Sequence, residues 1–177
     1  MYQQADEGRS GMSEFFDQLT RDIEAAPCER GIIGLSESEI DAVRSVYGQL
    51  LPAYYLEFLR RMGSSAGVLW MGTDAFYPEI MKIKSWALEL LSENKVSHFM
   101  PETAIVIAIH QGYQVYWLEP SNVDDPPAAT YIEGSSDIGN RWDSFSGLIC
   151  SEAAQAIALW PNKEDNQTCT LDVFSGE

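Results

Sequence analysis

The chain has 177 residues, 45% of them hydrophobic and 11% aromatic, which is too apolar for a wholly disordered protein and fits one domain with a substantial core. Its 27 acidic residues outnumber its 11 lysines and arginines, so the formal net charge is -16 at pH 7. This charge argues against free nucleic acid or an anionic membrane as a partner and favours a cationic one, although acidic surfaces also simply keep soluble proteins dispersed.

The negative charge is concentrated in the second half of the chain. Residues 101–177 hold twelve acidic side chains and two basic ones, Arg141 and Lys163, whereas residues 35–100 hold eight acidic and six basic side chains. We therefore expect any acidic binding surface to come from the second half.

The cysteines and the N-terminal residues indicate the compartment. Cys28, Cys150 and Cys169 are widely spaced and outside any CxxC pattern, which predicts reduced thiols and neither a disulfide framework nor a zinc site. The first residues lack the basic and apolar regions of an export signal, and no apolar run reaches about 18 residues. We expect a cytoplasmic protein that is neither exported nor inserted into a membrane.

The first elements are predicted to be helices. Residues 1–12 are polar and predict a flexible lead-in, and residues 13–26 carry apolar side chains at the three- and four-residue spacing of an amphipathic helix. Ser36 and Glu39 have the spacing of a capping box, so a second helix should begin there and end at Gly48.

A third helix is predicted in the stretch "LPAYYLEFLRRMG". Pro52 fits its first turn, where a missing N–H has no intrahelical partner, and Gly63 is expected to end it. Four apolar side chains share one face of this helix, namely Tyr55, Phe58, Leu59 and Met62.

Strands are predicted to follow. "VLWM", residues 68–71, is a short apolar run suited to a buried strand, and residues 77–94 are expected to form a helix that crosses over it. Three β-branched or aromatic runs separated by turn residues then predict an antiparallel meander, over residues 104–110, 113–119 and 129–133.

The end of the chain is predicted to close the fold. Residues 135–143 read as a loop with a brief edge strand, and Ser144 is expected to cap a helix that Pro161 ends. The polar tail, residues 162–177, has room for one extra strand. The expected fold class is α+β, with N-terminal helices packed on an antiparallel β-meander sheet and a closing C-terminal helix.

One motif suggests a catalytic nucleophile. "GSSAG", Gly63 to Gly67, matches the G-x-S-x-G pattern, which needs a strand before the serine and a helix after it. Here the predicted order is reversed, so a helix-to-strand turn is the better interpretation of Ser65.

Other polar residues allow alternatives. A nucleophile pair of Cys150 and His110 competes with a buried structural thiol, since Cys150 falls on the inward period of the closing helix. Asp124 and Asp125 would hold a divalent cation only if Glu119 or Glu133 came close, and otherwise form a solvated acidic loop. We predict no catalytic, cofactor-binding or metal-binding residues.

The ordered elements also resemble a known family. The stretch from Leu51 to Gly63 has the form L-P-x-x-Y-x-x-F-L and ends in Met-Gly; it is followed by a glycine-led strand pair, a strand that begins near proline and a helix led by Ser-Phe. This series resembles the SUKH superfamily, bacterial immunity proteins related to a fungal regulator of cell-wall assembly, in which Asn-Gly is usual where Met62 and Gly63 stand. The matching residues are Leu51, Pro52, Tyr55, Phe58, Leu59 and Gly63, then Gly112, Tyr116, Pro127, Ser144, Phe145 and Leu148.

The resemblance implies both a fold and a function. It implies a single SUKH-like α+β domain over residues 13–161 that binds and neutralises a polymorphic toxin, commonly a nuclease or another secreted enzyme, without a cofactor. It supplies no set of partner-binding residues, because those surfaces differ with the toxin. We expect a monomer or a weak homodimer.

The charge adds a more specific expectation. Acidic loops in the meander and beyond should face a basic toxin, because complementary charge steers association. The residues expected on this surface are Glu119, Asp124, Asp125, Glu133, Asp137 and Asp143.

Two other functions remain open from the sequence. One is a regulatory protein-interaction scaffold of the fungal cell-wall-regulator type, which would bind several host proteins. The other is a small hydrolase that uses Ser65, Cys150 or His110.

Overall fold

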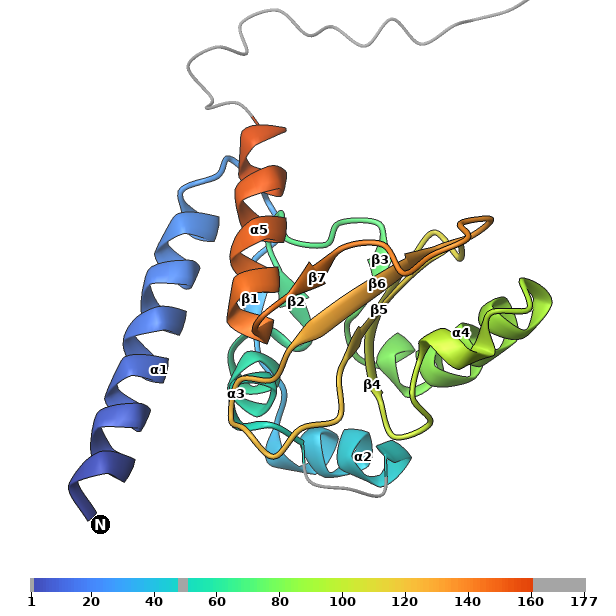
Figure 1. Ribbon diagram of the computed structural model, residues 1–177. Coiled ribbons are helices and arrows are strands. Elements are labelled where there is room, and N and C mark those ends of the chain that lie inside the picture. The colour runs from blue at the N-terminus through green and yellow to red at the C-terminus, as the bar shows by residue number, and fades with distance from the viewer. Residues whose placement is uncertain (1, 48–50, 161–177) are drawn as a thin grey trace, which may run out of the picture.

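The computed structural model describes residues 2–47 and 51–160, with the side chains of residues 2–9 left undescribed. It is an α+β fold, as predicted (Figure 1). The helices within these ranges are α1 (Tyr2–Glu24), α2 (Glu37–Tyr47), α3 (Ala53–Met62), α4 (Ile83–Glu93) and α5 (Phe145–Ala158), with the short 3-10 helices η1 (Glu79–Met81) and η2 (Ser97–Phe99).

The described strands form two antiparallel sheets. The smaller sheet pairs β1 (Ile32–Ile33) with β2 (Ser65–Ala66). The larger sheet follows chain order, as a meander does, through β3 (Thr73–Asp74), β4 (Ile105–His110), β5 (Gln114–Leu118), β6 (Ala128–Ile132) and β7 (Arg141–Trp142).

The N-terminal helices follow local sequence signals. The Ser36 backbone N–H donates to the Glu39 carboxylate at 2.8 Å, and the Glu39 N–H donates back to the Ser36 hydroxyl at 3.4 Å, so the predicted capping box begins α2. Pro52 stands at the N-cap of α3, and its carbonyl accepts from the Leu56 N–H at 2.9 Å. The predicted end of α2 at Gly48 lies outside the described residues.

Gly63 is needed for a close approach. Its φ of -69° is open to any residue, but a Cβ there would lie 2.6 Å from the Leu59 carbonyl oxygen and 2.7 Å from the Leu35 side chain. The glycine therefore lets the segment before α2 pack against the end of α3, where the Leu35 N–H donates to the Leu59 carbonyl at 2.9 Å.

The β4–β5 hairpin has the turn that its "QG" dipeptide predicts. Gln111 and Gly112 have φ values of 47° and 79°, and the Tyr113 N–H donates to the His110 carbonyl at 3.2 Å. Positive φ at both central residues is the property of a type I′ turn, whose twist matches that of the strands. His110 and Tyr113 therefore lie together at the tip.

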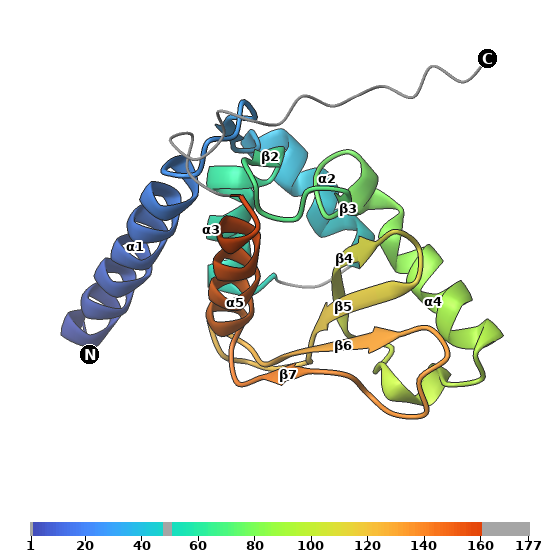
Figure 2. The same ribbon diagram turned by 90° about the horizontal axis from the view of Figure 1, so that it is seen from above.

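Helices cover both faces of the larger sheet. α4 lies on one side, and α3 and α5 lie on the other (Figure 2). On the α3–α5 side, the buried Phe145 ring packs edge-on against Tyr55 and Phe58, with centroids 5.6 and 5.8 Å apart. The apolar face of "LPAYYLEFLRRMG" is thus core, and its role is to join α3 to the closing helix.

Three details differ from the sequence predictions. The first helix begins at Tyr2, so residues 2–12, expected as a lead-in, are helical. Residues 68–71 form turns, in which residues 68–70 are buried and Met71 is exposed. Trp70 and the preceding Gly67 have φ values of 54° and 56°, which a strand cannot adopt. Cys150 is exposed, one position beyond the buried Ile149, so its prediction as a buried thiol was wrong.

Candidate functional site

The six carboxylates predicted to bind a partner divide between two ends of the larger sheet. Glu119, Asp124, Asp125 and Asp143 lie where β5 ends, β6 begins and β7 leads into α5; we call this the loop end. Glu133 and Asp137 follow β6 at its opposite end, beside the β4–β5 hairpin tip, where the Glu133 N–H donates to the Tyr113 carbonyl at 2.8 Å. They do not form one cluster.

Two carboxylates at the loop end have structural partners. Asp125 accepts from the Ser146 backbone N–H at 2.9 Å and from its hydroxyl at 2.5 Å, next to the Ser144 hydroxyl that caps α5. Glu119 forms an ion pair with Arg141 at 2.5 Å. Asp124, Asp143, Glu133 and Asp137 remain exposed.

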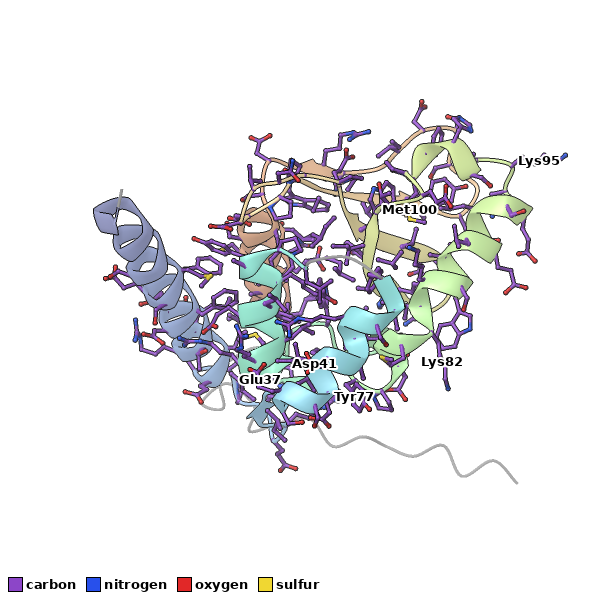
Figure 3. The ribbon with its side chains drawn as sticks, turned by 90° about the horizontal axis from the view of Figure 1, so that it is seen from below. Glu37, Asp41, Tyr77, Lys82, Lys95 and Met100 are labelled. Atoms are coloured by element: carbon purple, nitrogen blue, oxygen red, sulfur yellow. The ribbon has the colours of Figure 1, made fainter. Side chains whose placement is uncertain are left out.

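Basic residues lie mainly elsewhere. Arg141 is the one lysine or arginine described between residues 101 and 160. The described lysines all lie on or beside α4, where Lys82 precedes the helix and Lys95 follows it (Figure 3). The α4 side therefore carries both signs of charge, with Glu89 and Glu93 beside the lysines, whereas the meander loops carry mainly carboxylates.

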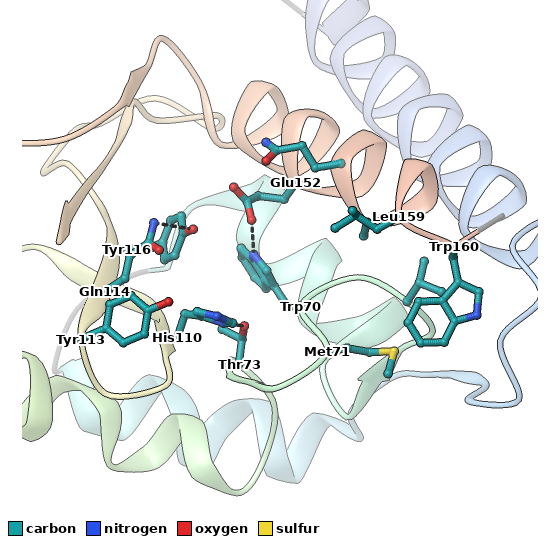
Figure 4. Close-up of a pocket in the computed structure, with 13 residues that line it drawn as sticks. Trp70, Met71, Thr73, His110, Tyr113, Gln114, Tyr116, Glu152, Leu159 and Trp160 are labelled. Carbon is teal, nitrogen blue, oxygen red and sulfur yellow. Dashed lines mark hydrogen bonds between the residues drawn. The ribbon is translucent and has the colours of Figure 1, made fainter. Parts of the chain in front are cut away.

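The structure also contains a pocket that the sequence did not reveal. A cavity of about 390 Å³ lies between α5, the turn at Trp70 to Thr73 and the β4–β5 hairpin tip (Figure 4). We call it the Trp70 pocket. Its lining includes Trp70, Tyr113, Tyr116, Glu152 and Trp160, of which Tyr113 and Trp160 remain 39% and 38% exposed.

Glu152 is the acidic residue of this pocket. The Trp70 indole N–H donates to its carboxylate at 3.1 Å (Figure 4), and the Tyr116 hydroxyl lies near it. Burial raises the pKa of Glu152, against the lowering effects of the Trp70 bond, of nearby His110 and of the Tyr116 hydroxyl. Among the described residues, Glu152 makes no ion pair.

Neighbouring polar groups fix the walls of the pocket. The Gln114 amide donates to the Tyr116 hydroxyl at 2.7 Å, and the Thr73 hydroxyl lies 2.7 Å from His110 Nδ1, across the β3–β4 pair. Burial, followed by the charge of Glu152, raises the pKa of Tyr116, so this hydroxyl keeps its proton. Glu152 can therefore accept a hydrogen bond from a ligand or pair with a positively charged group.

The candidate nucleophiles are not assembled for catalysis. The Ser65 hydroxyl is nearly buried in β2 and donates to the Gly31 carbonyl at 2.6 Å, so it ties the two strands together. Desolvation, followed by the charges of Asp22 and Asp125, raises the pKa of the Cys150 thiol, which disfavours the reactive thiolate. His110 bonds to Thr73.

Residues 2–47 and 51–160 offer neither a cluster of metal ligands nor a membrane-spanning helix. This part of the chain contains no group of three His, Cys, Asp or Glu side chains that could hold a metal ion. None of its helices is both long and apolar enough to cross a membrane.

Sequence reasoning missed Glu152, although one signal was present. Glu152 is the single charged residue in α5, whose sequence is FSGLICSEAAQAIA. A lone charge in an apolar helix calls for a partner inside the fold. That partner, Trp70, stands 82 residues earlier in the chain, which no local pattern indicates.

The chain has an α+β fold with acidic loops and a pocket lined by aromatic side chains and Glu152. Its residues 34–151 match the family model described as SMI1 / KNR4 family (SUKH-1), and the chain belongs to this family. The predicted SUKH relationship is thereby confirmed, and the match includes every residue on which it rested. No curated protein matches the chain.

Proposed function

We propose that this protein is a non-catalytic immunity protein that binds and neutralises a secreted bacterial toxin, a basic enzyme such as a nuclease. Membership of the SUKH-1 family supports an immunity or regulatory role. The observation that carries the finer proposal is the charge: residues 101–160 place eight carboxylates against one arginine, and that arginine is already paired with Glu119.

The mechanism is electrostatic steering followed by occlusion. A nuclease must attract phosphates, so its cleft carries positive potential, and an acidic protein competes for the same field. Complementary charge raises the association rate, while buried aromatic contacts slow dissociation. Such an inhibitor performs no chemistry, which agrees with the structural bonds of Ser65 and His110.

Four of the six predicted carboxylates are best suited to this surface. Asp125 bonds to Ser146 at the start of α5, and Glu119 pairs with Arg141. The other four are exposed and have no salt bridge within the described part of the chain. We assign partner steering to Asp124, Glu133, Asp137 and Asp143.

The test first asks whether the neighbouring reading frame encodes a secreted toxin domain, and then uses that domain as the partner. Co-expression of the two proteins should restore growth, and the association rate should fall steeply between low and moderate salt. A variant with Asp124, Asp137 and Asp143 changed to Asn and Glu133 changed to Gln should associate about tenfold more slowly at low salt.

A matched control separates location from net charge. Changing Glu24, Glu29, Glu89 and Glu93 to Gln removes the same charge from exposed positions outside the meander. This control should retain nearly the wild-type rate. Equal slowing in both variants would contradict the assigned surface, and purification of a host regulator instead of a toxin would favour the scaffold function.

A further inference from the structure

We propose that the Trp70 pocket receives an arginine side chain of the partner protein, with its guanidinium group at Glu152. This inference deepens the proposed function and rests on it for the basic character of the partner. The family match ends at Ser151, so family membership assigns nothing to Glu152 or to Trp160.

The first argument is charge complementarity. Glu152 is partly buried, and the groups bonded to it or beside it, the Trp70 indole and the Tyr116 hydroxyl, are neutral. The described lining of the pocket contains no lysine or arginine; its histidine, His110, lies near Glu152 and bonds to Thr73, but makes no ion pair with Glu152 among the described residues. A desolvated carboxylate without an ion pair is costly to keep in a fold, and an incoming cation would offset that cost.

The second argument is the chemistry of the walls. Trp70 and Tyr116 lie next to the carboxylate, and the rings of Tyr113 and Trp160 line the same pocket. A guanidinium is planar and weakly hydrated, stacks on aromatic faces and donates to carboxylates in a fixed fork. Lysine has a compact, strongly hydrated ammonium, which makes less use of such walls. The cavity, at about 390 Å³, falls within the range of ordinary ligand sites.

The third argument is the conformation of Trp70. A bulky residue with φ of 54° is a backbone outlier, and such residues occur disproportionately at ligand clamps and active sites. Here the left-handed conformation accompanies an indole that reaches Glu152 and packs beside Tyr116, with ring centroids 6.2 Å apart. Trp160 is held at the opposite wall by its indole N–H, which donates to the Pro27 carbonyl at 3.1 Å.

The test uses the full-length protein and a small probe, so it does not depend on a toxin. N-acetyl-arginine-N′-methylamide is titrated in low salt while the indole N–H resonance of Trp70 is followed by NMR. We expect a saturable shift with a dissociation constant on the order of millimolar, as suits a single side chain. The citrulline analogue, which is isosteric but neutral, should bind at least about tenfold more weakly.

Two variants locate the binding. Glu152→Gln keeps an oxygen that accepts from Trp70 and should weaken arginine binding at least about tenfold. Glu93→Gln, an exposed control on α4 across the sheet, should leave it unchanged. A Trp70 resonance that does not move, equal binding of citrulline, or an unchanged affinity in Glu152→Gln would overturn the proposal, and tighter binding of the lysine analogue would overturn the choice of arginine.

Failure of this inference is separable from failure of the proposed function. If the protein protects against the toxin but its pocket does not bind arginine, the immunity role stands and the pocket has no part in it. Arginine binding by a protein that protects against no toxin would retain the pocket and contradict the immunity role.

Discussion

The loop end of the sheet and the Trp70 pocket both contain carboxylates, but they use them differently. At the loop end, Asp125 and Glu119 bond to the protein itself, through Ser146 and Arg141. In the pocket, Glu152 accepts from the neutral Trp70 indole and lies near His110, without an ion pair among the described residues. A high density of acidic residues in the sequence therefore does not by itself locate a binding site, because some of those charges hold the fold.

The largest expected effect tests whether Asp125 is structural. Asp125→Ala should lower the free energy of unfolding by about 2 kcal/mol, since it removes charge-assisted bonds at the start of α5. Asp124→Ala, the exposed neighbour, is the control and should change it by no more than about 0.5 kcal/mol. Urea unfolding measures both, and equal losses would erase the distinction between the two residues.

The second-largest expected effect concerns Glu152, whose ionised carboxylate we expect to lower the free energy of unfolding. Its pKa is raised in the folded state, so its contribution to stability is fully present below the unfolded pKa and is lost as the pH rises through the folded pKa. Glu152→Gln does not titrate, so at neutral pH it should melt a few degrees higher than the wild type.

The pH profile of that variant provides the check. Below pH about 4, where the carboxyl is protonated in both states, the melting temperatures of wild type and Glu152→Gln should converge. Glu93→Gln serves as the control for removing one charge from the whole molecule. If the wild type is more stable than Glu152→Gln at neutral pH, the Glu152 carboxylate stabilises the fold, as that of Asp125 does. The loop end and the Trp70 pocket would then use their carboxylates in the same way.

The fold was largely predictable where local signals act alone. The capping box of Ser36 and the turn between the first two meander strands depend on neighbours within a few residues, and both appear where predicted. Pro52, predicted in the first turn of α3, stands one position earlier, at the N-cap. The strand predicted at residues 68–71 was wrong because a short apolar run has no periodicity that distinguishes strand from buried turn.

The candidate site was predictable only in part. The acidic loops were visible as composition, but their division between two ends of the sheet depends on strand pairing. Cys150 was placed wrongly because the apolar α5 has a weak helical period. The hydrogen bond between Trp70 and Glu152 could not be predicted, because it joins residues that are 82 positions apart and come together only in the folded chain.

The smallest expected effect comes from removing the one arginine at the loop end. Arg141→Gln removes the cation that pairs with Glu119 and should change the free energy of unfolding by less than about 0.5 kcal/mol, because the pair is solvent-exposed and screened. The same change leaves the loop end more negative, so association with a basic toxin should become about twofold faster at low salt and return to the wild-type rate at high salt. Stopped-flow measurements at two ionic strengths would detect this. Slower association would mean that Arg141 itself contacts the toxin, in which case the loop end would be an interface defined by its hydrogen bonds as much as by its charge.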